Sequence, residues 1–296
     1  MTERVLRIDE ENRAAGPSCG QVRIAEPMTP RTLEALGVPR PFPPAEPGFA
    51  PDGDWTQTYR IWGGHGWIDC CYKTVGVLRL QRERIAKDAG PGDGHRLRVE
   101  QRIIYEGGIV HTIEAEAASA DDTMGSLRRW TVRSEVTTTS GEPDPRLRSS
   151  QEGQVNADGR SWQSTVSGVR ETTRKRPLDG PLTSDWSLIE AVQRLPFAPI
   201  ECPTFHLLEG MTMPKRGFRL YHRETPEEGL KEQDLPLHRF YLIGRGQLPT
   251  DYWVDDHHRL IMAVSGSRAL FLDDDAETPF QASLEYQRAG KGYYHE

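Results

Sequence analysis

The 296-residue chain lacks long apolar runs, and it contains four cysteines and seven tryptophans. Its longest apolar run, at about Leu260–Val264, is far shorter than the roughly 20 apolar residues that a membrane-spanning helix needs. Residues 1–7 contain no apolar segment typical of a signal peptide. We therefore expect no membrane span and, by default, a cytoplasmic location, with a removed leader as the open alternative.

An excess of basic residues is also missing, since the formal net charge is −7. Nucleic acids and anionic membranes are bound by concentrated basic faces, so neither is the expected partner. The basic run Arg170–Arg176 is interrupted by Glu171 and two threonines, and we expect it to form a solvated strand face.

The four cysteines, Cys19, Cys70, Cys71 and Cys202, include no CxxC pair, so no structural zinc site is predicted. A disulfide from Cys202 to Cys19 or to the Cys70–Cys71 pair remains open beside the commoner outcome of buried free thiols. The run Asp255–His258 has ordinary turn composition. We predict no metal ion and no cofactor.

Proline is dense in residues 1–54, which predicts an extended N-terminal arm with one short helix at residues 30–36. From Trp55 onward, short runs of alternating polar and apolar residues are separated by glycine, aspartate and proline. Residues 55–296 are therefore predicted to form a single antiparallel β domain.

The alternation is clearest where Leu97, Val99 and Ile103 share one strand face, and in the predicted meander Leu237–Asp274. The fold class predicted is mainly β: a large curved antiparallel sheet or half-barrel with one amphipathic helix packed on it. Further strands are expected at 57–62, 74–85 with a bend at Gly76, 109–115, 127–138, 148–155, 161–174, 204–208, 217–222 and 280–287.

One strong helix is predicted between Ser184 and Leu195, where Leu188, Val192 and Leu195 recur at helical spacing. Thr183 or Ser184 is its expected N-cap, and Pro196 ends it. A single amphipathic helix among strands should pack on the sheet and close one opening of its apolar face.

The glycine-rich turn and strand of residues 63–77, the long hairpins that follow, and the strand Tyr252–Asp255 with its reverse partner together resemble bacterial lipoprotein-carrier-like proteins. The resemblance is architectural and spans residues 55–275. It implies a curved antiparallel sheet that wraps a helix and holds a ligand in an apolar concavity.

No Gly-x-Ser-x-Gly nucleophile motif is present. Two polar pairs are the candidate catalytic residues: His65 with Asp69 near a glycine-rich bend, and His206 with His222 if their strands pair. Core or turn positions are the plainer explanation for each of them. Aromatic residues on a concave sheet could instead line a ligand site, and the candidates are Trp67, Tyr72, Trp130 and Trp253.

The leading hypothesis is a noncatalytic protein that binds a small hydrophobic or amphiphilic ligand, or a carbohydrate, in a concave face. The alternative is a carbohydrate-active hydrolase or lyase that uses histidine, tyrosine and carboxylate side chains. A third hypothesis is an interaction protein that binds its partner through the proline-rich arm. Whether the protein is an enzyme, and its oligomeric state, stay open.

Overall fold

The computed structural model describes residues 43–44, 47–65, 71–85, 94–200, 202–210, 213–223, 237–266 and 268–289. The predicted helix at 30–36 and nearly all of the predicted arm lie outside these ranges. The elements are β1 (Trp55–His65), β2 (Cys71–Arg84), β3 (His95–Ile104), η3 (Glu106–Gly108), β4 (Val110–Ser119), β5 (Leu127–Thr137), η4 (Pro145–Leu147), β6 (Ser149–Val155), β7 (Ser161–Ser167), β8 (Thr172–Pro177), β9 (Leu182–Ser184), α2 (Asp185–Arg194), β10 (Phe205–Glu209), β11 (Met213–Arg223), β12 (Leu237–Ile243), β13 (Thr250–Asp255), β14 (Leu260–Ser265), β15 (Arg268–Leu272) and α4 (Glu277–Arg288).

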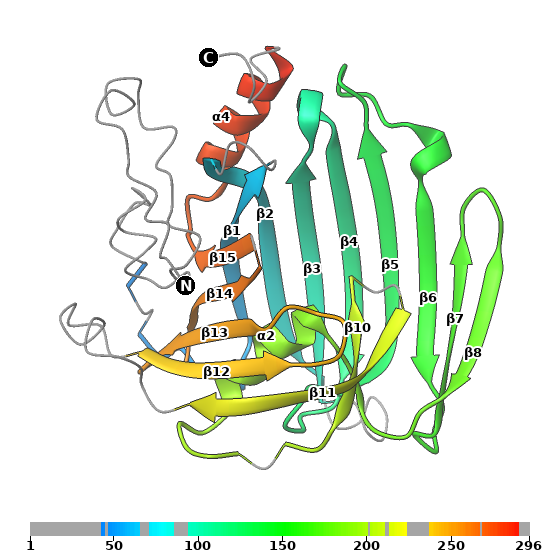
Figure 1. Ribbon diagram of the computed structural model, residues 1–296, viewed down its shortest axis with the longest axis vertical. Helices are drawn as coiled ribbons and strands as arrows, with labels where there is room; N and C mark the ends of the chain where they lie inside the picture. The colour runs from blue at the N-terminus through cyan, green and yellow to red at the C-terminus, as the bar shows by residue number, and fades with distance from the viewer. Residues whose placement is uncertain are drawn as a thin grey trace, which may run out of the picture.

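The strands form one 15-stranded sheet in the order β8-β7-β6-β5-β4-β3-β2-β1-β15-β14-β13-β12-β11-β10-β9 (Figure 1). Its two ends, β8 and β9, do not pair with each other, so the described sheet is open. Neighbouring strands are antiparallel except β9 and β10, which pair in parallel. The predicted class, mainly β with a large curved sheet, is confirmed. The first half of the sheet is β1–β8 and the second half is β9–β15.

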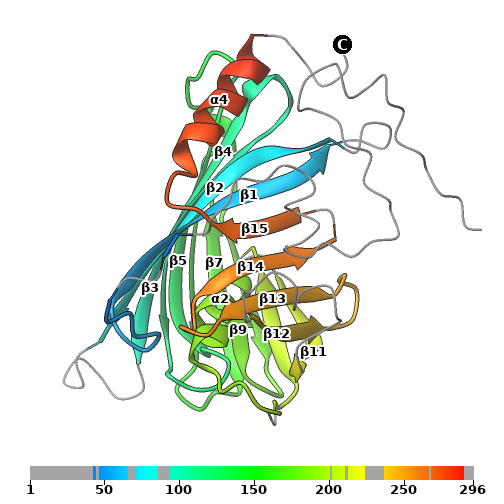
Figure 2. The same ribbon diagram turned by 90° about the vertical axis from the view of Figure 1, so that its left-hand side faces the viewer.

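The sheet curves so that its second half crosses in front of the lower part of the first half, with α2 between them (Figures 1 and 2). A bulge lies where the register of β1 and β2 shifts between Ile61 and Trp62, opposite the predicted bend at Gly76. Bulges bend strands and increase their twist. The main apolar core draws on α2 and on both halves of the sheet.

Helix α2 confirms the predicted helix. Ser184 is its N-cap, and its hydroxyl accepts a hydrogen bond from the backbone N–H of Ser187 at 3.0 Å. Residues 186–193 are all buried, and α2 contacts β9, β10, β13 and β14. The helix is thus enclosed by the curved sheet and lies deeper than the amphipathic pattern alone indicates.

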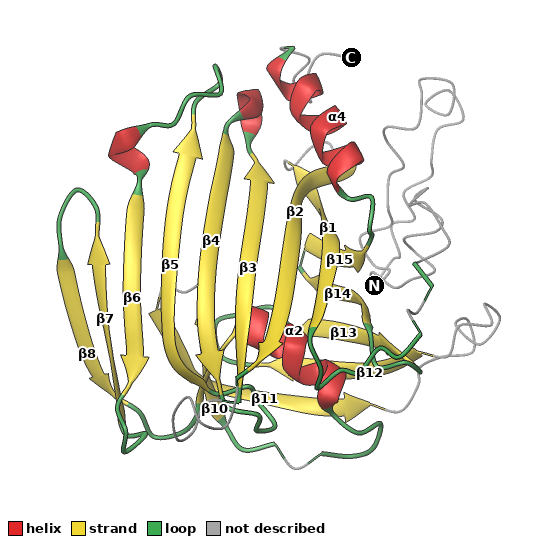
Figure 3. Ribbon diagram, turned by 180° about the vertical axis from the view of Figure 1, so that it is seen from behind, coloured by secondary structure: helices red, strands yellow, loops and turns green. Residues whose placement is uncertain are grey.

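The predicted strand at 280–287 is wrong, because this segment lies within helix α4. Phe280, Leu284 and Gln287 recur at helical spacing and are its buried residues. The first two pack with Val77, Ile104 and Val110 in a separate apolar cluster. Helix α4 runs along the upper end of the sheet beside β2 (Figure 3). The apolar side chains of these three strand residues are covered by Phe280 and Leu284, which lie four residues apart on one face of the helix.

The predicted strand 161–174 is also wrong in its extent, because it is two strands, β7 and β8, separated at residues 168–171. Every residue of β8 is exposed, which confirms the solvated basic face. No helix in the described ranges is long and apolar enough to cross a membrane. The division into residues 1–54 and 55–296 stays a prediction.

Gly153 in β6 provides a test of the packing. It lies opposite Trp130 in the register of β5 and β6, and a methyl group on it would lie 2.1 Å from Cε2 of Trp130. Because the Trp130 side chain is buried and cannot move freely, we expect Gly153→Ala to lower the free energy of unfolding by about 1–3 kcal/mol. Urea denaturation measures this difference.

Gly168→Ala is the matched control. Its added methyl group would meet no atom closer than 3.4 Å, and the position has no positive φ. We expect an effect of about 0.5 kcal/mol or less there. Equal losses in the two variants would contradict the packing of Trp130 against Gly153.

Candidate ligand cavity and buried polar cluster

A cavity of about 190 Å³ lies between the N-terminal half of α2 and the two halves of the sheet. Its walls come from eight strands and the helix. They include Ile61, Leu78, Ile103, Ile189, Leu207 and Leu242. The aromatic residues on its wall are Trp186 and Tyr252. Neither is among the four aromatic residues that the sequence analysis predicted as ligand contacts.

Polar groups enter the same cavity at a few points. Asp185, the first residue of α2, accepts backbone hydrogen bonds from Trp186 at 3.1 Å and from Gly210 at 3.2 Å. Gln247 has a buried side-chain oxygen with no hydrogen-bond partner among the described residues. Trp186 donates its indole N–H to Gln101 at 3.3 Å. Glu209, Thr250, Ser265 and Arg268 also line the cavity, and Arg268 is exposed. Asp185 and Gln247 are two of the hydrogen-bond acceptors that the cavity offers.

Burial raises the pKa of Asp185 from 3.8 to about 6, and the nearby charge of Glu209 adds to the shift, while the two backbone N–H groups oppose it. Burial also raises the pKa of Tyr252 well above its usual value, with a smaller contribution from the Asp185 charge. The Asp185 carboxyl group can thus gain or lose a proton near neutral pH.

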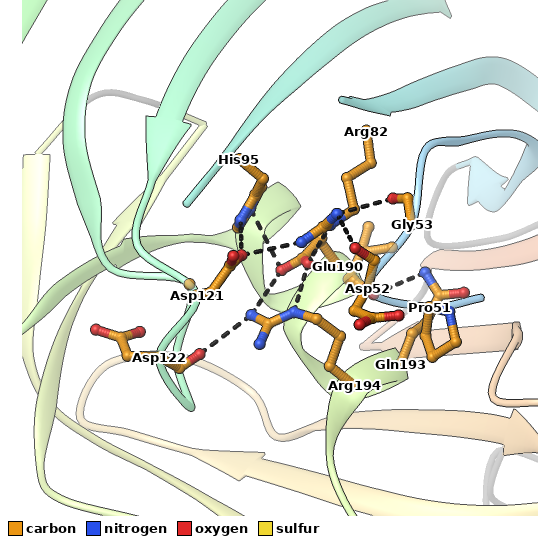
Figure 4. Close-up of polar contacts among 12 residues, drawn as sticks. Pro51, Asp52, Gly53, Arg82, His95, Asp121, Asp122, Glu190, Gln193 and Arg194 are labelled. Atoms are coloured by element: carbon orange, nitrogen blue, oxygen red, sulfur yellow. Dashed lines mark hydrogen bonds and ion pairs between the residues drawn. The ribbon is translucent and has the colours of Figure 1, made fainter. Parts of the chain in front are cut away.

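The Glu190 side chain, in the C-terminal half of α2, is also fully buried and forms several polar contacts (Figure 4). Glu190 is 0% exposed and accepts hydrogen bonds from Arg82 Nε at 2.7 Å and from Arg194 Nε at 2.5 Å. Arg82, itself 1% exposed, also donates to the backbone oxygens of Asp52 and Gly53. One helical carboxylate therefore ties together β2, α2 and the segment that precedes β1.

His95 and Asp121 complete this polar cluster, which we define as Arg82, His95, Asp121, Glu190 and Arg194. The Nδ1 atom of His95 lies 2.8 Å from Oδ1 of Asp121, and its Nε2 lies 3.4 Å from Oε2 of Glu190. Burial lowers the pKa of His95, although the two carboxylates oppose this shift.

Among the described residues, His95, Asp121 and Glu190 are the one group with spacing suited to a metal ion. The guanidinium groups of Arg82 and Arg194 already bind the carboxylates, and two cations balance two anions when His95 is neutral. A divalent ion would add uncompensated charge to a buried site. We assign the polar cluster a structural role.

The structure does not bring His206 and His222 together. His206 lies where Phe205 and Leu207 of β10 oppose Phe218 and Lys215 of β11, whereas His222 is four residues beyond Phe218, about 13 Å along the strand. His206 Nε2 contacts Asp179 at 2.5 Å. The His222 ring instead lies beside His238 and Phe240.

The two predicted aromatic ligand contacts whose side chains the structure describes lie away from the cavity next to α2. Trp130 and Trp253 are 2% and 1% exposed, and neither is among the residues that line the cavity next to α2. Trp253 alternates with Tyr252 along β13, so it faces the other side of the strand. Trp67 and Asp69 lie outside the described residues, as do the side chains of His65 and Tyr72.

The sequence analysis did not predict the polar cluster, although the alternation of side chains along strands indicated that two of its members face the core. Arg82 follows Leu78 and Leu80 at even spacing, which places its side chain on the core face. His95 precedes Leu97 and Val99 in the same way. A charged residue at a core position requires a buried partner, but nothing in the sequence showed that Glu190 is that partner.

Comparisons with known proteins do not assign a function to the chain. No protein-family model matches the chain, and no curated protein matches it. A crystal structure described as a beta-barrel-like protein of domain of unknown function DUF1849, from Brucella abortus, aligns with 75% of this chain and 96% of its own, at 9% identity and a TM-score of 0.41. The function therefore has to be inferred from the chain's own residues.

We expect Glu190→Gln to lower the free energy of unfolding by about 3–5 kcal/mol, because two buried guanidinium groups lose their anion. Denaturant unfolding measures the loss. The matched control is Glu135→Gln, since Glu135 pairs with the exposed Arg148 at the surface. That change should cost about 1 kcal/mol or less. Similar small losses in both variants would contradict the structural role of the polar cluster.

A second prediction concerns Asp185. Because its folded pKa, about 6, exceeds the unfolded value of 3.8, the folded state holds the proton more tightly. The carboxyl group therefore stabilises the protein below about pH 4, and this contribution is lost as the pH rises to about 6. The stability difference between wild type and Asp185→Asn should fall across this window and then level off. A difference that stays constant from pH 4 to pH 7 would show that Asp185 titrates normally.

Proposed function

We propose that the protein binds a small amphiphilic molecule in the cavity next to α2. The observation that carries the proposal is the cavity itself, which has apolar walls from both halves of the sheet and polar groups at a few fixed points. Concave apolar sites with few, placed polar groups are typical of small-molecule binding.

The size and polarity of the cavity narrow the ligand class. Its volume, about 190 Å³, is below the range of about 300–1,000 Å³ typical of drug-sized ligands, so a short apolar chain or one small ring fits. Asp185 and Gln247 present acceptor oxygens, which favour a ligand that carries a hydrogen-bond donor. A hydroxyl or amino group on an apolar body meets both requirements.

The resemblance to lipoprotein-carrier-like proteins is in keeping with this proposal, and it stays a prediction. The carbohydrate-active enzyme alternative needed one of two polar pairs to converge in a cleft. His206 in β10 and His222 in β11 lie apart along the direction of the paired strands, and the pair His65 and Asp69 falls outside the described side chains. No geometry among the described residues favours catalysis over binding.

Ala263→Leu tests the cavity. Ala263 lines it from β14, and a longer side chain there occupies the ligand's space. We expect hexylamine and 1-hexanol to bind the wild-type protein in isothermal titration calorimetry. Hexanoate should bind about tenfold more weakly or not at all, because its carboxylate meets Asp185 and Glu209 in the wall, while Arg268 is exposed to water. Ala263→Leu should lose the binding of both.

Val264→Leu is the matched control, since the adjacent residue points to the opposite face of β14 and does not line the cavity. It should bind hexylamine as the wild type does. Unchanged binding in Ala263→Leu, or hexanoate binding equal to that of hexylamine, would rule out this site.

A further inference from the structure

A larger cavity, of about 540 Å³, lies at the lower end of the long strands. In Figure 1, β5 begins, β6 ends and turns into β7, and β8 ends in this region, where the chain continues towards β9. The residues that line it include Ser126, Arg128, Arg160, Asp122 and Asp179. None of these residues lines the cavity next to α2.

Arg128 reaches this second cavity through a bulge. In the register of β4 and β5, Ala118 pairs with Arg129 and Ser119 pairs with Leu127, so Arg128 is an extra, unpaired residue. Such a bulge redirects the side chain that it carries. The Nε atom of Arg128 is buried without a hydrogen-bond partner, and its guanidinium group forms no ion pair with the described residues.

Arg160 and Ser126 lie on the wall of the same cavity. The backbone of Arg160 is fixed in the β6–β7 turn by hydrogen bonds to Asp158 and Leu178, while no described residue binds its side chain. Ser126 is 7% exposed, and its hydroxyl oxygen is buried without a hydrogen-bond partner. Buried polar groups are nearly always satisfied, so the Ser126 hydroxyl group and Nε of Arg128 require an explanation.

The two carboxylates in the cavity wall already have donors. Asp122 Oδ1 accepts backbone hydrogen bonds from Met124 and Ser126, at 3.1 and 2.9 Å. Asp179 contacts His206 at 2.5 Å and Arg216 at 4.0 Å, and the hydrogen bond from His206 is the largest cause of its lowered pKa. Both carboxylates thus accept hydrogen bonds, but neither forms an ion pair with Arg128 or Arg160 among the described residues.

We propose that this second cavity binds a phosphate group. Arginine guanidinium groups form bidentate hydrogen bonds with phosphate oxygens, and a serine hydroxyl group supplies one more donor. Arg128, Arg160 and Ser126 together provide these donors from β5, from the β6–β7 turn and from the loop before β5. The oxygens of a phosphate group accept hydrogen bonds from such donors, and its charge offsets that of the two guanidinium groups.

The remaining wall of the cavity is apolar, with Leu127, Val155, Leu178 and Leu182. A free phosphate ion leaves this surface uncovered, whereas the organic part of a phosphate monoester covers it. The second cavity therefore favours a phosphate monoester with an apolar substituent over inorganic phosphate.

Isothermal titration calorimetry with inorganic phosphate, phenyl phosphate and phenol tests this assignment on the full chain. We expect phenyl phosphate to bind more tightly than phosphate, and phenol not to bind at this site. Each of Arg128→Gln and Arg160→Gln should weaken phenyl phosphate binding by about tenfold, in line with the loss of a charged hydrogen-bond pair. The double variant should show no binding. Arg160 is exposed in a turn, so its variant is expected to fold normally even if the bulge variant does not.

Arg174→Gln is the matched control, because Arg174 is an exposed arginine of β8 that does not line the second cavity. It removes the same charge and should leave phenyl phosphate binding unchanged. Undiminished binding in Arg160→Gln, an equal loss in Arg174→Gln, or phenol binding as tight as that of phenyl phosphate would overturn the proposal. Phosphate binding as tight as that of phenyl phosphate would overturn the preference for an ester. Ala263→Leu should have no effect here, which separates this test from that of the cavity next to α2.

Discussion

The position of α2 depends on the buried ion pair between Arg82 and Glu190. Both side chains are almost fully removed from water, where an unpaired charge would cost several kcal/mol. The pair therefore forms only when the helix lies against the end of β2, in one rotation about its axis. Arg194, His95 and Asp121 add to the same cluster, so charge balance at this point links β2, β3, the loop before β5 and the helix.

A second buried polar contact holds the helix to both halves of the sheet. The side-chain amides of Gln193 and Gln57 exchange two hydrogen bonds, and Gln193 also accepts the backbone N–H of Leu260 in β14. With one end of the helix fixed to both halves, its other end cannot move in to fill the space beside Ile61 and Leu242. The cavity next to α2 persists for this reason, and Asp185 is held at its edge.

The two proposed sites lie in separate places, and one offers hydrogen-bond acceptors while the other offers donors. The cavity next to α2 is apolar with acceptor oxygens, and it lies where the two halves of the sheet face each other across the helix. The phosphate site has donor groups and lies where three strand ends meet. Neither site shares a lining residue with the other. The charged groups thus divide between a buried structural cluster and a surface cavity whose two arginines form no ion pair with the described residues.

The local pattern of the sequence determined most of the strands and turns, and α2 with its Ser184 cap, because side-chain alternation and helix capping act over only a few residues. It did not determine α4, whose weak pattern becomes helical only because Phe280 and Leu284 cover Val77, Ile104 and Val110 on a distant part of the chain. Strand parity placed Arg82 and His95 on core faces, yet their partner Glu190 lies about 100 residues away. Trp186, Tyr252, Arg128 and Arg160 meet their cavities only after the sheet curves. Such long-range pairings are decided by packing and charge balance in three dimensions, which no short stretch of sequence encodes.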